Sequence, residues 1–183
     1  MNTQINITKN GTTTLATASK YCDRNIDVNV EVPSYEAELA EQKAITDSIL
    51  DREITEYVND TAINFGLYAF AYCRSLTKIR CDAVRILRNY SLRDCSVLTE
   101  ARFDSLTTIA TQVFLNCTAL EKLILGSSTL CELTNANAFQ SSAIANGTGY
   151  VYVPDDLVDS YKKTATNWVT YANQIKGISE LGG

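Results

Sequence analysis

A 22-residue repeat constrains this sequence more than any other feature. The segments "FAYCRSLTKIRC", "LRDCSVLTEARF" and "FLNCTALEKLIL" begin at residues 70, 92 and 114, so one pattern returns at a fixed interval. Six of its columns hold only apolar residues or cysteine: Phe65, Leu87 and Ile109; Phe70, Leu92 and Phe114; Cys73, Cys95 and Cys117; Leu76, Leu98 and Leu120; Ile79, Ala101 and Leu123; Cys81, Phe103 and Leu125. A single unit cannot bury such a face alone, whereas stacked units form a continuous core. We therefore expect about three parallel coils over residues 61–133, preceded by a capping start at 52–60.

Each repeat contains a short stretch that alternates between inward and outward residues. In "KIRC", Ile79 and Cys81 belong to apolar columns, so Lys78 and Arg80 should point to solvent. Such strands should stack as a parallel ladder with a spacing of about 4.8 Å. The outward columns define a candidate recognition surface: Lys78, Glu100 and Lys122; Arg80, Arg102 and Ile124; Asp82 and Asp104, with Gly126 completing the last column. Two interpretations remain open, a solvated face with weak ion pairs or a surface that binds a partner.

The cysteine column predicts core packing rather than chemistry. Cys73, Cys95 and Cys117 recur at one position, as expected of small buried thiols, and a redox or metal role is the less favoured alternative. Cys22, Cys81 and Cys131 fall outside this column and have no evident partner. Since no Cys-x-x-Cys pair occurs, we expect no zinc site.

Several function classes are disfavoured by what the sequence lacks. There is no histidine, which is the commonest general base and metal ligand, and no nucleotide-binding or nucleophile-elbow motif. An acidic cluster at Asp155, Asp156 and Asp159 could hold a cation, but acids are also common at helix N-termini. We expect no enzyme activity, no cofactor and no metal.

Charge and hydropathy also narrow the range of partners. The net charge is −5 and the pI is near 4.8, which argues against nucleic acid as a partner. No apolar run approaches the roughly 20 residues of a membrane span, and the first residues lack the features of a signal peptide. One Asn-x-Thr sequon adjoins the core cysteine Cys117, so we interpret the sequons as accidental and the origin as non-eukaryotic.

Residues 1–33 predict a small β module that needs a partner surface. Ile5 and Ile7 alternate with polar residues, and Asn10-Gly11 predicts a hairpin turn. A second alternating strand forms a candidate docking face of Ile26, Val28, Val30 and Val32. It could cover another copy of the chain, another protein or the end of the solenoid.

Residues 34–53 predict a connecting helix. Ser34 is a plausible N-cap, and the helix should run to about Asp51. It could pack on its own domain or form a short oligomeric stalk.

Residues 54–183 predict a solenoid with a C-terminal helical cap. The segment 135–144 is a degenerate fourth unit, and "YVYVP" at 150–154 is a final strand. Asp155 should be the N-cap of the following helix, while Trp168 and Tyr171 should cover the open core.

The repeats resemble a known family. The unit "AFAYCRSLTKI" and its echo "VFLNCTALEKLIL" resemble the BspA-like leucine-rich repeats of bacterial surface proteins, which implies an α/β leucine-rich-repeat solenoid. The ending "GTGYVYVPDDLVDSYKKTATNWVTYANQI" is similar to the cap that follows such repeats in proteins of gut Firmicutes and their phages. The opening "NITKNGTTTLATASKYCDRNIDVNVEVP" resembles a short module of phage and prophage structural proteins.

The resemblance favours a phage virion structural protein, such as a fibre, tail or capsid accessory protein. Such a protein would dock on other virion proteins through residues 1–33 and display the solenoid to a host-surface protein or glycan. A homo-oligomer, with a trimer favoured, and a location in the virion would follow. The alternative is a bacterial cell-surface or secreted adhesin, which the lack of an export signal disfavours. A cytoplasmic interaction protein is a more distant third.

Overall fold

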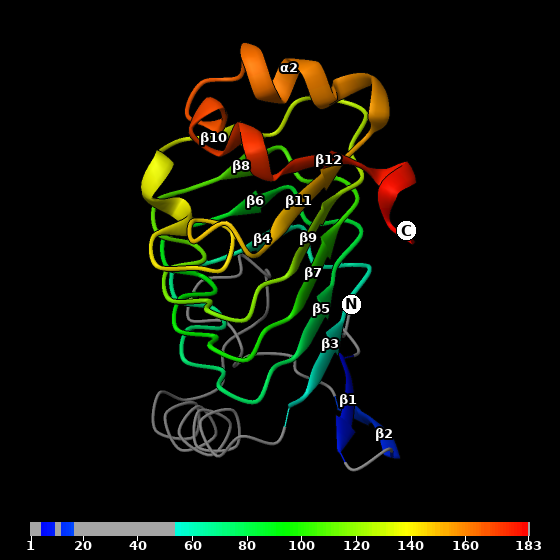
Figure 1. Ribbon diagram of the computed structural model, residues 1–183. Coiled ribbons are helices and arrows are strands. Elements are labelled where there is room, and N and C mark those ends of the chain that lie inside the picture. Colours follow the sequence, from blue (N-terminus) through cyan, green and yellow to red (C-terminus); the bar gives the residue numbers. More distant parts are fainter. Residues whose placement is uncertain (1–4, 10–11, 17–53, 183) are drawn as a thin grey trace.

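Two sheets run along the solenoid and enclose its core. The computed structural model describes residues 5–9, 12–16 and 54–182. Within this part of the chain, sheet A has the strand order β12-β11-β9-β7-β5-β3-β1-β2, and sheet B has the order β10-β8-β6-β4. Figure 1 shows the coils stacked one above another, with the two sheets on different sides of each coil. The prediction of an α/β leucine-rich-repeat solenoid with parallel strand ladders is confirmed.

The elements are short, as a 22-residue coil requires. The strands of sheet A are β1 (Ile5–Lys9), β2 (Thr12–Ala16), β3 (Glu56–Val58), β5 (Lys78–Arg80), β7 (Glu100–Phe103), β9 (Lys122–Leu125), β11 (Tyr150–Val153) and β12 (Ile175–Gly177). Those of sheet B are β4 (Asn64–Phe65), β6 (Ile86–Leu87), β8 (Thr108–Ile109) and β10 (Glu132–Leu133). One α-helix, α2 (Val158–Lys163), and 3₁₀ helices at Ala136–Phe139, Asp155–Leu157, Trp168–Gln174 and Ile178–Glu180 complete the described elements.

Each coil contributes one strand to sheet A and then one to sheet B. The pairs β3/β4, β5/β6, β7/β8 and β9/β10 follow this order, and neighbouring coils pair in parallel. Tyr57 of β3 lies opposite Ile79 of β5, so the first coil begins before residue 61, within the predicted capping start. The second ladder arises because Phe65, Leu87 and Ile109 pair in register across sheet B.

A threonine column fixes the register between coils. The backbone nitrogen of Thr77 donates to the Thr55 carbonyl at 2.7 Å, and its hydroxyl donates to the same oxygen at 2.8 Å. Thr99 repeats both bonds to the Thr77 carbonyl at 2.8 and 3.0 Å. Each coil thereby satisfies a carbonyl of the preceding one just before its sheet A strand begins.

The turns between the sheets place residues in the left-handed backbone region at two recurring positions. One column holds Tyr68, Tyr90 and Gln112, and the other holds Tyr72, Asp94 and Asn116, with φ between 53° and 66° in both. Asn and Asp tolerate this conformation, whereas a bulky tyrosine does so at a cost. The coil geometry, rather than local preference, therefore sets the backbone at these turns.

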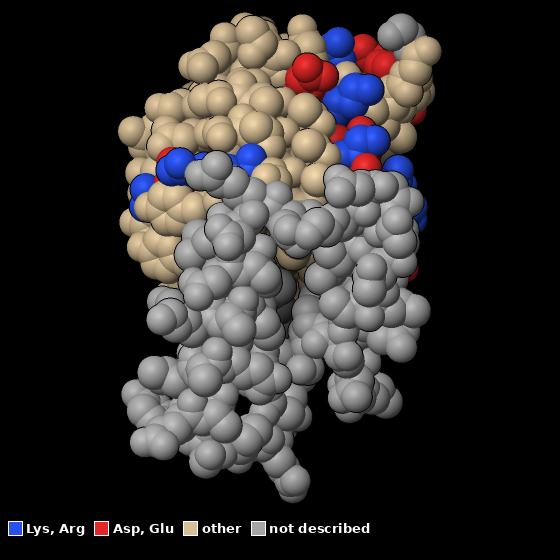
Figure 2. Space-filling view, turned by 90° about the horizontal axis from the view of Figure 1, so that it is seen from below, with Lys and Arg blue, Asp and Glu red and all other residues tan. Residues whose placement is uncertain are grey.

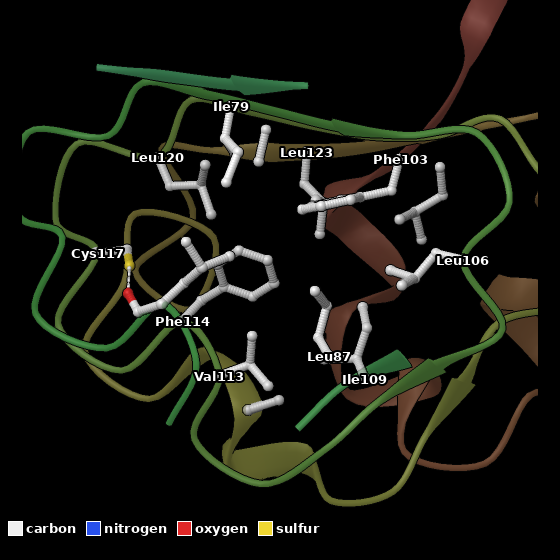
Figure 3. Close-up of a cluster of buried hydrophobic side chains, with 14 of the residues drawn as sticks. Ile79, Leu87, Phe103, Leu106, Ile109, Val113, Phe114, Cys117, Leu120 and Leu123 are labelled. Atoms are coloured by element: carbon white, nitrogen blue, oxygen red, sulfur yellow. Dashed lines mark hydrogen bonds between the residues drawn. The ribbon is translucent and has the colours of Figure 1, made fainter. Parts of the chain in front are cut away.

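The core consists of stacked columns between the sheets. Leu76, Leu98 and Leu120 have no solvent-exposed surface, which confirms the predicted leucine stack. The close-up in Figure 3 shows Ile79, Phe103 and Leu123 of sheet A pointing toward Leu87 and Ile109 of sheet B. The two periodic faces of the sequence thus meet in one continuous core.

The cysteine column lies inside this core. Cys95 Sγ donates to the Phe70 carbonyl at 3.0 Å, and Cys117 Sγ donates to the Leu92 carbonyl at 3.2 Å (Figure 3). The five cysteines of the described part of the chain are buried free thiols, which confirms the predicted burial of Cys73, Cys95 and Cys117. Burial raises the pKa of the Cys117 thiol to about 12, so this side chain stays protonated at neutral pH. Cys22 lies outside the described residues.

The C-terminal segment closes the last coil, as predicted. Trp168 has no exposed surface, and its indole nitrogen donates to the Cys131 carbonyl at 2.7 Å. The Cys131 backbone nitrogen in turn donates to the Tyr161 hydroxyl at 2.7 Å. Phe139 stacks on Phe114 with ring centroids 5.4 Å apart, which carries the aromatic column into the degenerate fourth unit. These contacts satisfy the backbone groups that a missing next coil would otherwise have paired.

Two details of the predicted cap are wrong. The strand at 150–153 is not the final one, because β12 pairs with it in parallel, with Val151 opposite Ile175. Asp155 is not an N-cap: no side-chain bond caps that helix, and the Asp155 carboxylate accepts from the Ser179 backbone nitrogen and hydroxyl at 3.3 and 2.9 Å. The turn after β12 folds back onto Asp155, and a sequence pattern does not show such a long-range contact.

The N-terminal strands join sheet A. β1 and β2 pair antiparallel with Lys9 opposite Thr12, so the predicted hairpin pairing is confirmed, although the turn residues Asn10 and Gly11 lie outside the described part. β1 also pairs antiparallel with β3 of the first coil.

Other predictions for this end of the chain stay untested. The docking face Ile26, Val28, Val30 and Val32 and the helix at 34–53 lie outside the described residues. The domain boundaries 1–33, 34–53 and 54–183 remain predictions.

Candidate functional site

The outer face of sheet A gathers the predicted recognition residues. Lys78 lies opposite Glu100, which lies opposite Lys122 on the next strand. Arg80 lies opposite Arg102 in the same ladder. We call this surface the charged face and define it by three rows: Glu56, Lys78, Glu100 and Lys122; Arg80 and Arg102; Asp60, Asp82 and Asp104.

Ion pairs on the charged face run along the strands. Arg80 Nη2 lies 2.8 Å from Asp82 Oδ2, and Arg102 Nε lies 3.0 Å from Asp104 Oδ1. Both arginines donate a second bond to the same carboxylate, from Arg80 Nε at 3.0 Å and from Arg102 Nη2 at 3.1 Å. The hydrogen bond from Arg80 holds the pKa of the Asp82 carboxyl below its ordinary value. These two-point contacts hold four charged side chains in one orientation. Long exposed side chains without such contacts adopt many orientations.

The row of Glu56, Lys78, Glu100 and Lys122 alternates in sign along the solenoid axis. Consecutive members come from neighbouring strands and are therefore about 4.8 Å apart along the ladder. Glu56, Lys78 and Lys122 are exposed, and Glu100 is half-buried. A partner surface with the opposite alternation would meet one charge at each step.

One predicted member of the recognition surface is wrong. Ile124 points outward from β9, as its position in the alternation requires, but only 4% of it is exposed. It lies between Arg102 on one side and Tyr152 on the other, at the same level of the ladder. Ile124 is therefore covered by its larger neighbours Arg102 and Tyr152 and is not available to contact a partner.

Gly126 occupies the position that follows Asp82 and Asp104 in their column, and the absence of a side chain there has a steric reason. A Cβ atom at this position would collide with the Asp104 carboxylate, so the missing side chain leaves room for Asp104 to pair with Arg102. The last coil thus supports an ion pair of the coil before it.

The distribution of charge is visible in Figure 2. On the side of sheet A, blue and red atoms lie close together, and a smaller, mainly blue group lies on the opposite side of the solenoid. The surface between them is largely tan in this view. In this view, side chains of both signs therefore gather on the side of sheet A.

Sequence reasoning overlooked several residues of this surface. Glu56 and Asp60 lie one repeat before Lys78 and Asp82, so extending the columns backward by 22 residues would have found them. Tyr152 and Lys176 extend the row of Arg80 and Arg102 across β11 and β12. No periodic signal marks these two, because the chain between their strands is not a standard repeat.

Two of the three acids in the candidate cation cluster make ordinary contacts. Asp155 binds Ser179, and Asp159 pairs with Lys163 at 2.9 Å across one helical turn. Within residues 5–9, 12–16 and 54–182, no group of three His, Cys, Asp or Glu side chains could hold a metal ion. Over the same residues, no helix has the length and apolar character needed to cross a bilayer.

Parallel coils with one leucine, one cysteine and one threonine position per turn define a leucine-rich-repeat solenoid, a class of domain that typically binds partners and is not catalytic. The model of the BspA type leucine-rich repeat region matches residues 52–149 in six copies. Because this match spans more than half of the chain, the protein belongs to the BspA-type leucine-rich repeat family. No curated protein matches the sequence.

Proposed function

We propose that this protein is a non-enzymatic binding protein of a phage virion that uses the charged face to hold a protein of complementary charge on the host surface. The observation that carries the proposal is the fixed alternation of charge over four successive strands. Exposed ion pairs add little stability, so such a row is better explained by recognition than by folding. Complementary charge mainly sets partner choice and the rate of encounter.

The virion part of the proposal rests on the N-terminal module. Residues 1–33 resemble modules of phage structural proteins, and we propose that they dock on other virion proteins and support a homo-oligomer, with a trimer favoured. Family membership alone equally suits a bacterial cell-surface or secreted adhesin, which is the second candidate. In both candidates the solenoid binds a partner. They differ in whether the protein belongs to a phage particle or to a bacterial cell.

A charge exchange tests the binding surface. The double variant Lys78→Glu with Glu100→Lys keeps the net charge but destroys the alternation, because two acidic side chains are then followed by two lysines along the row. Labelled protein should bind whole cells of the bacterium that carries the gene, and the exchange should abolish that binding. The matched control, Asp159→Lys with Lys163→Asp, reverses an exposed pair on α2 and should bind like the parent chain. Equal binding by both variants would refute a role of the charged face.

A fractionation experiment separates the two carriers. Particles induced from the same bacterium are purified and analysed by mass spectrometry, alongside the cell-wall fraction of uninduced cells. Recovery of the chain in particles supports the virion proposal. Recovery in the cell wall alone would overturn it in favour of the adhesin.

A further inference from the structure

We infer that a hollow at the C-terminal end of the charged face is a binding site for a neutral sugar. The hollow has a volume of about 360 Å³ and is lined by Thr118, Ala119, Glu121, Lys122, Ala143, Thr148, Tyr150 and Tyr152. Its size lies within the roughly 300–1,000 Å³ range of small-molecule sites. The inference goes beyond the proposed function, because it assigns a second site that can operate even if the charged face binds nothing.

The hollow offers mainly hydrogen-bond acceptors, so it favours a ligand that carries hydrogen-bond donors. Thr118 Oγ1 donates its own hydrogen to the Ser96 carbonyl at 3.2 Å, and Thr148 Oγ1 donates to the Ala143 carbonyl at 3.3 Å. The oxygens of both hydroxyls are therefore left as acceptors. The Glu121 carboxylate adds further acceptors, and Lys122 supplies donors. A molecule with several hydroxyl groups fits this set.

The charges of the lining disfavour a ligand that carries a single sign of charge. Glu121 and Lys122 both line the hollow and are opposite in sign, so its lining carries no net charge. A phosphate would face the Glu121 carboxylate, and an amine would face the Lys122 ammonium. A neutral polyol avoids both repulsions.

An aromatic ring supplies the apolar surface that one face of a pyranose needs. Lys176 Nζ lies 3.8 Å from the centre of the Tyr150 ring and holds it by a cation–π contact. Tyr150 itself lines the hollow, whereas Lys176 does not. The negative face of an aromatic ring attracts the weakly positive C–H groups of a sugar.

The loop of Thr148 and Gly149, which forms one wall of the hollow, is preformed by hydrogen bonds within the protein. The backbone nitrogens of Thr148 and Gly149 both donate to the Ala143 carbonyl, at 2.9 and 3.0 Å. A Cβ atom at position 149 would collide with the Leu120 carbonyl oxygen, so only glycine lets this loop lie against the coil below. The loop is thus fixed to the solenoid, and binding needs little ordering of the protein.

Nuclear magnetic resonance titration of the full chain tests the inference. The probes are cellobiose, lactose, maltose and chitobiose, with glucuronic acid and phosphocholine as charged comparisons. At least one neutral disaccharide should shift the amide signals of residues 118–122 and 148–152. No shift with any disaccharide, shifts confined to other residues, or stronger shifts with a charged probe would each overturn it.

Variants locate the sugar in the hollow. Tyr150→Ala should weaken the best disaccharide by roughly tenfold, the upper end expected of one aromatic contact. Glu121→Gln keeps the shape of an exposed side chain and should also weaken binding, which guards against a folding defect in the first variant. Tyr72→Ala removes an exposed tyrosine from the first coil and should bind like the parent chain. The exchange of Lys78 and Glu100 should leave sugar binding intact, so the two proposals fail independently. Unchanged affinity in both hollow variants would refute the site.

Discussion

Single residues in this protein act through the column to which they belong. Leu98 is covered above and below by Leu76 and Leu120, and all three have no exposed surface. Val97 precedes it in the sequence and is 38% exposed, so adjacent apolar residues occupy opposite environments. The energetic weight of a residue therefore follows from its position in the repeat rather than from its hydropathy.

Truncating the central leucine should show this difference. Leu98→Ala should lower the free energy of unfolding by about 2–5 kcal/mol, because it leaves a cavity between two other coils. Val97→Ala is the matched control and should change it by less than roughly 0.5 kcal/mol. Chemical denaturation of the three proteins measures both. Similar losses for the two variants would contradict the burial of the leucine column.

The buried thiols should be unreactive until the fold opens. Cys73, Cys95 and Cys117 should label slowly in native buffer and completely after denaturation without reductant. The pKa of Cys117 is raised from the ordinary value of 9.0 to about 12, so the protonated thiol favours the folded state. That contribution is full below pH 9 and declines as the pH rises toward 12. Rapid native labelling of all three thiols would contradict their burial.

At the scale of elements, the cap replaces the next coil. Trp168 and Tyr161 satisfy the carbonyl and the backbone nitrogen of Cys131, and Tyr171 donates to the Ala136 carbonyl. The rings of Tyr161 and Trp168 meet edge to face with centroids 5.2 Å apart. In the last coil, side chains of the cap thus form the hydrogen bonds that the backbone of the next coil forms in the earlier coils.

Removing the indole should open the last coil first. Trp168→Ala should cost about 3–5 kcal/mol, as for other buried tryptophans, and should make Cys131 label before the thiols of the central column. Val169→Ala changes a neighbour that is 48% exposed and should leave both stability and labelling unchanged. Mass spectrometry of labelled peptides identifies the order. Simultaneous labelling of Cys131 and Cys95 would mean that the cap and the coils open as one unit.

At the scale of the molecule, the two ends of sheet A are completed differently. The C-terminal end continues in parallel through β11 and β12, while the first coil is flanked by the antiparallel hairpin of β1 and β2. A parallel solenoid strand and an antiparallel hairpin strand can share one sheet because each offers a complete row of hydrogen bonds.

Deleting residues 1–33 should separate folding from assembly. The coils from β3 to β12 contain the continuous core, so the truncated chain should still unfold cooperatively, although it loses the partner strand of β3. It should be monomeric if residues 1–33 hold the proposed oligomer together. Light scattering after size-exclusion chromatography compares it with the full chain. A truncated chain that keeps the mass of the full-length oligomer would place the assembly contacts in the solenoid.

The sequence by itself determined the solenoid, its core columns and the direction of the charged rows. A 22-residue period makes every coil a copy of its neighbour, so one correctly placed leucine predicts the environment of two others. The same period placed Lys78, Arg80 and Glu100 on one outer face. Local alternation, together with the Asn10-Gly11 turn signal, also predicted the pairing of β1 with β2.

Only the tertiary structure decided the features that join segments of unequal spacing. The burial of Ile124, the bond between Asp155 and Ser179, and the hollow beside Tyr150 all depend on β11 and β12. These strands follow connections that do not repeat the 22-residue unit, so no column in the sequence aligns them with β9. A periodic sequence predicts contacts between equivalent positions, whereas the packing of non-equivalent segments depends on shape and hydrogen bonding that appear only once the chain is folded.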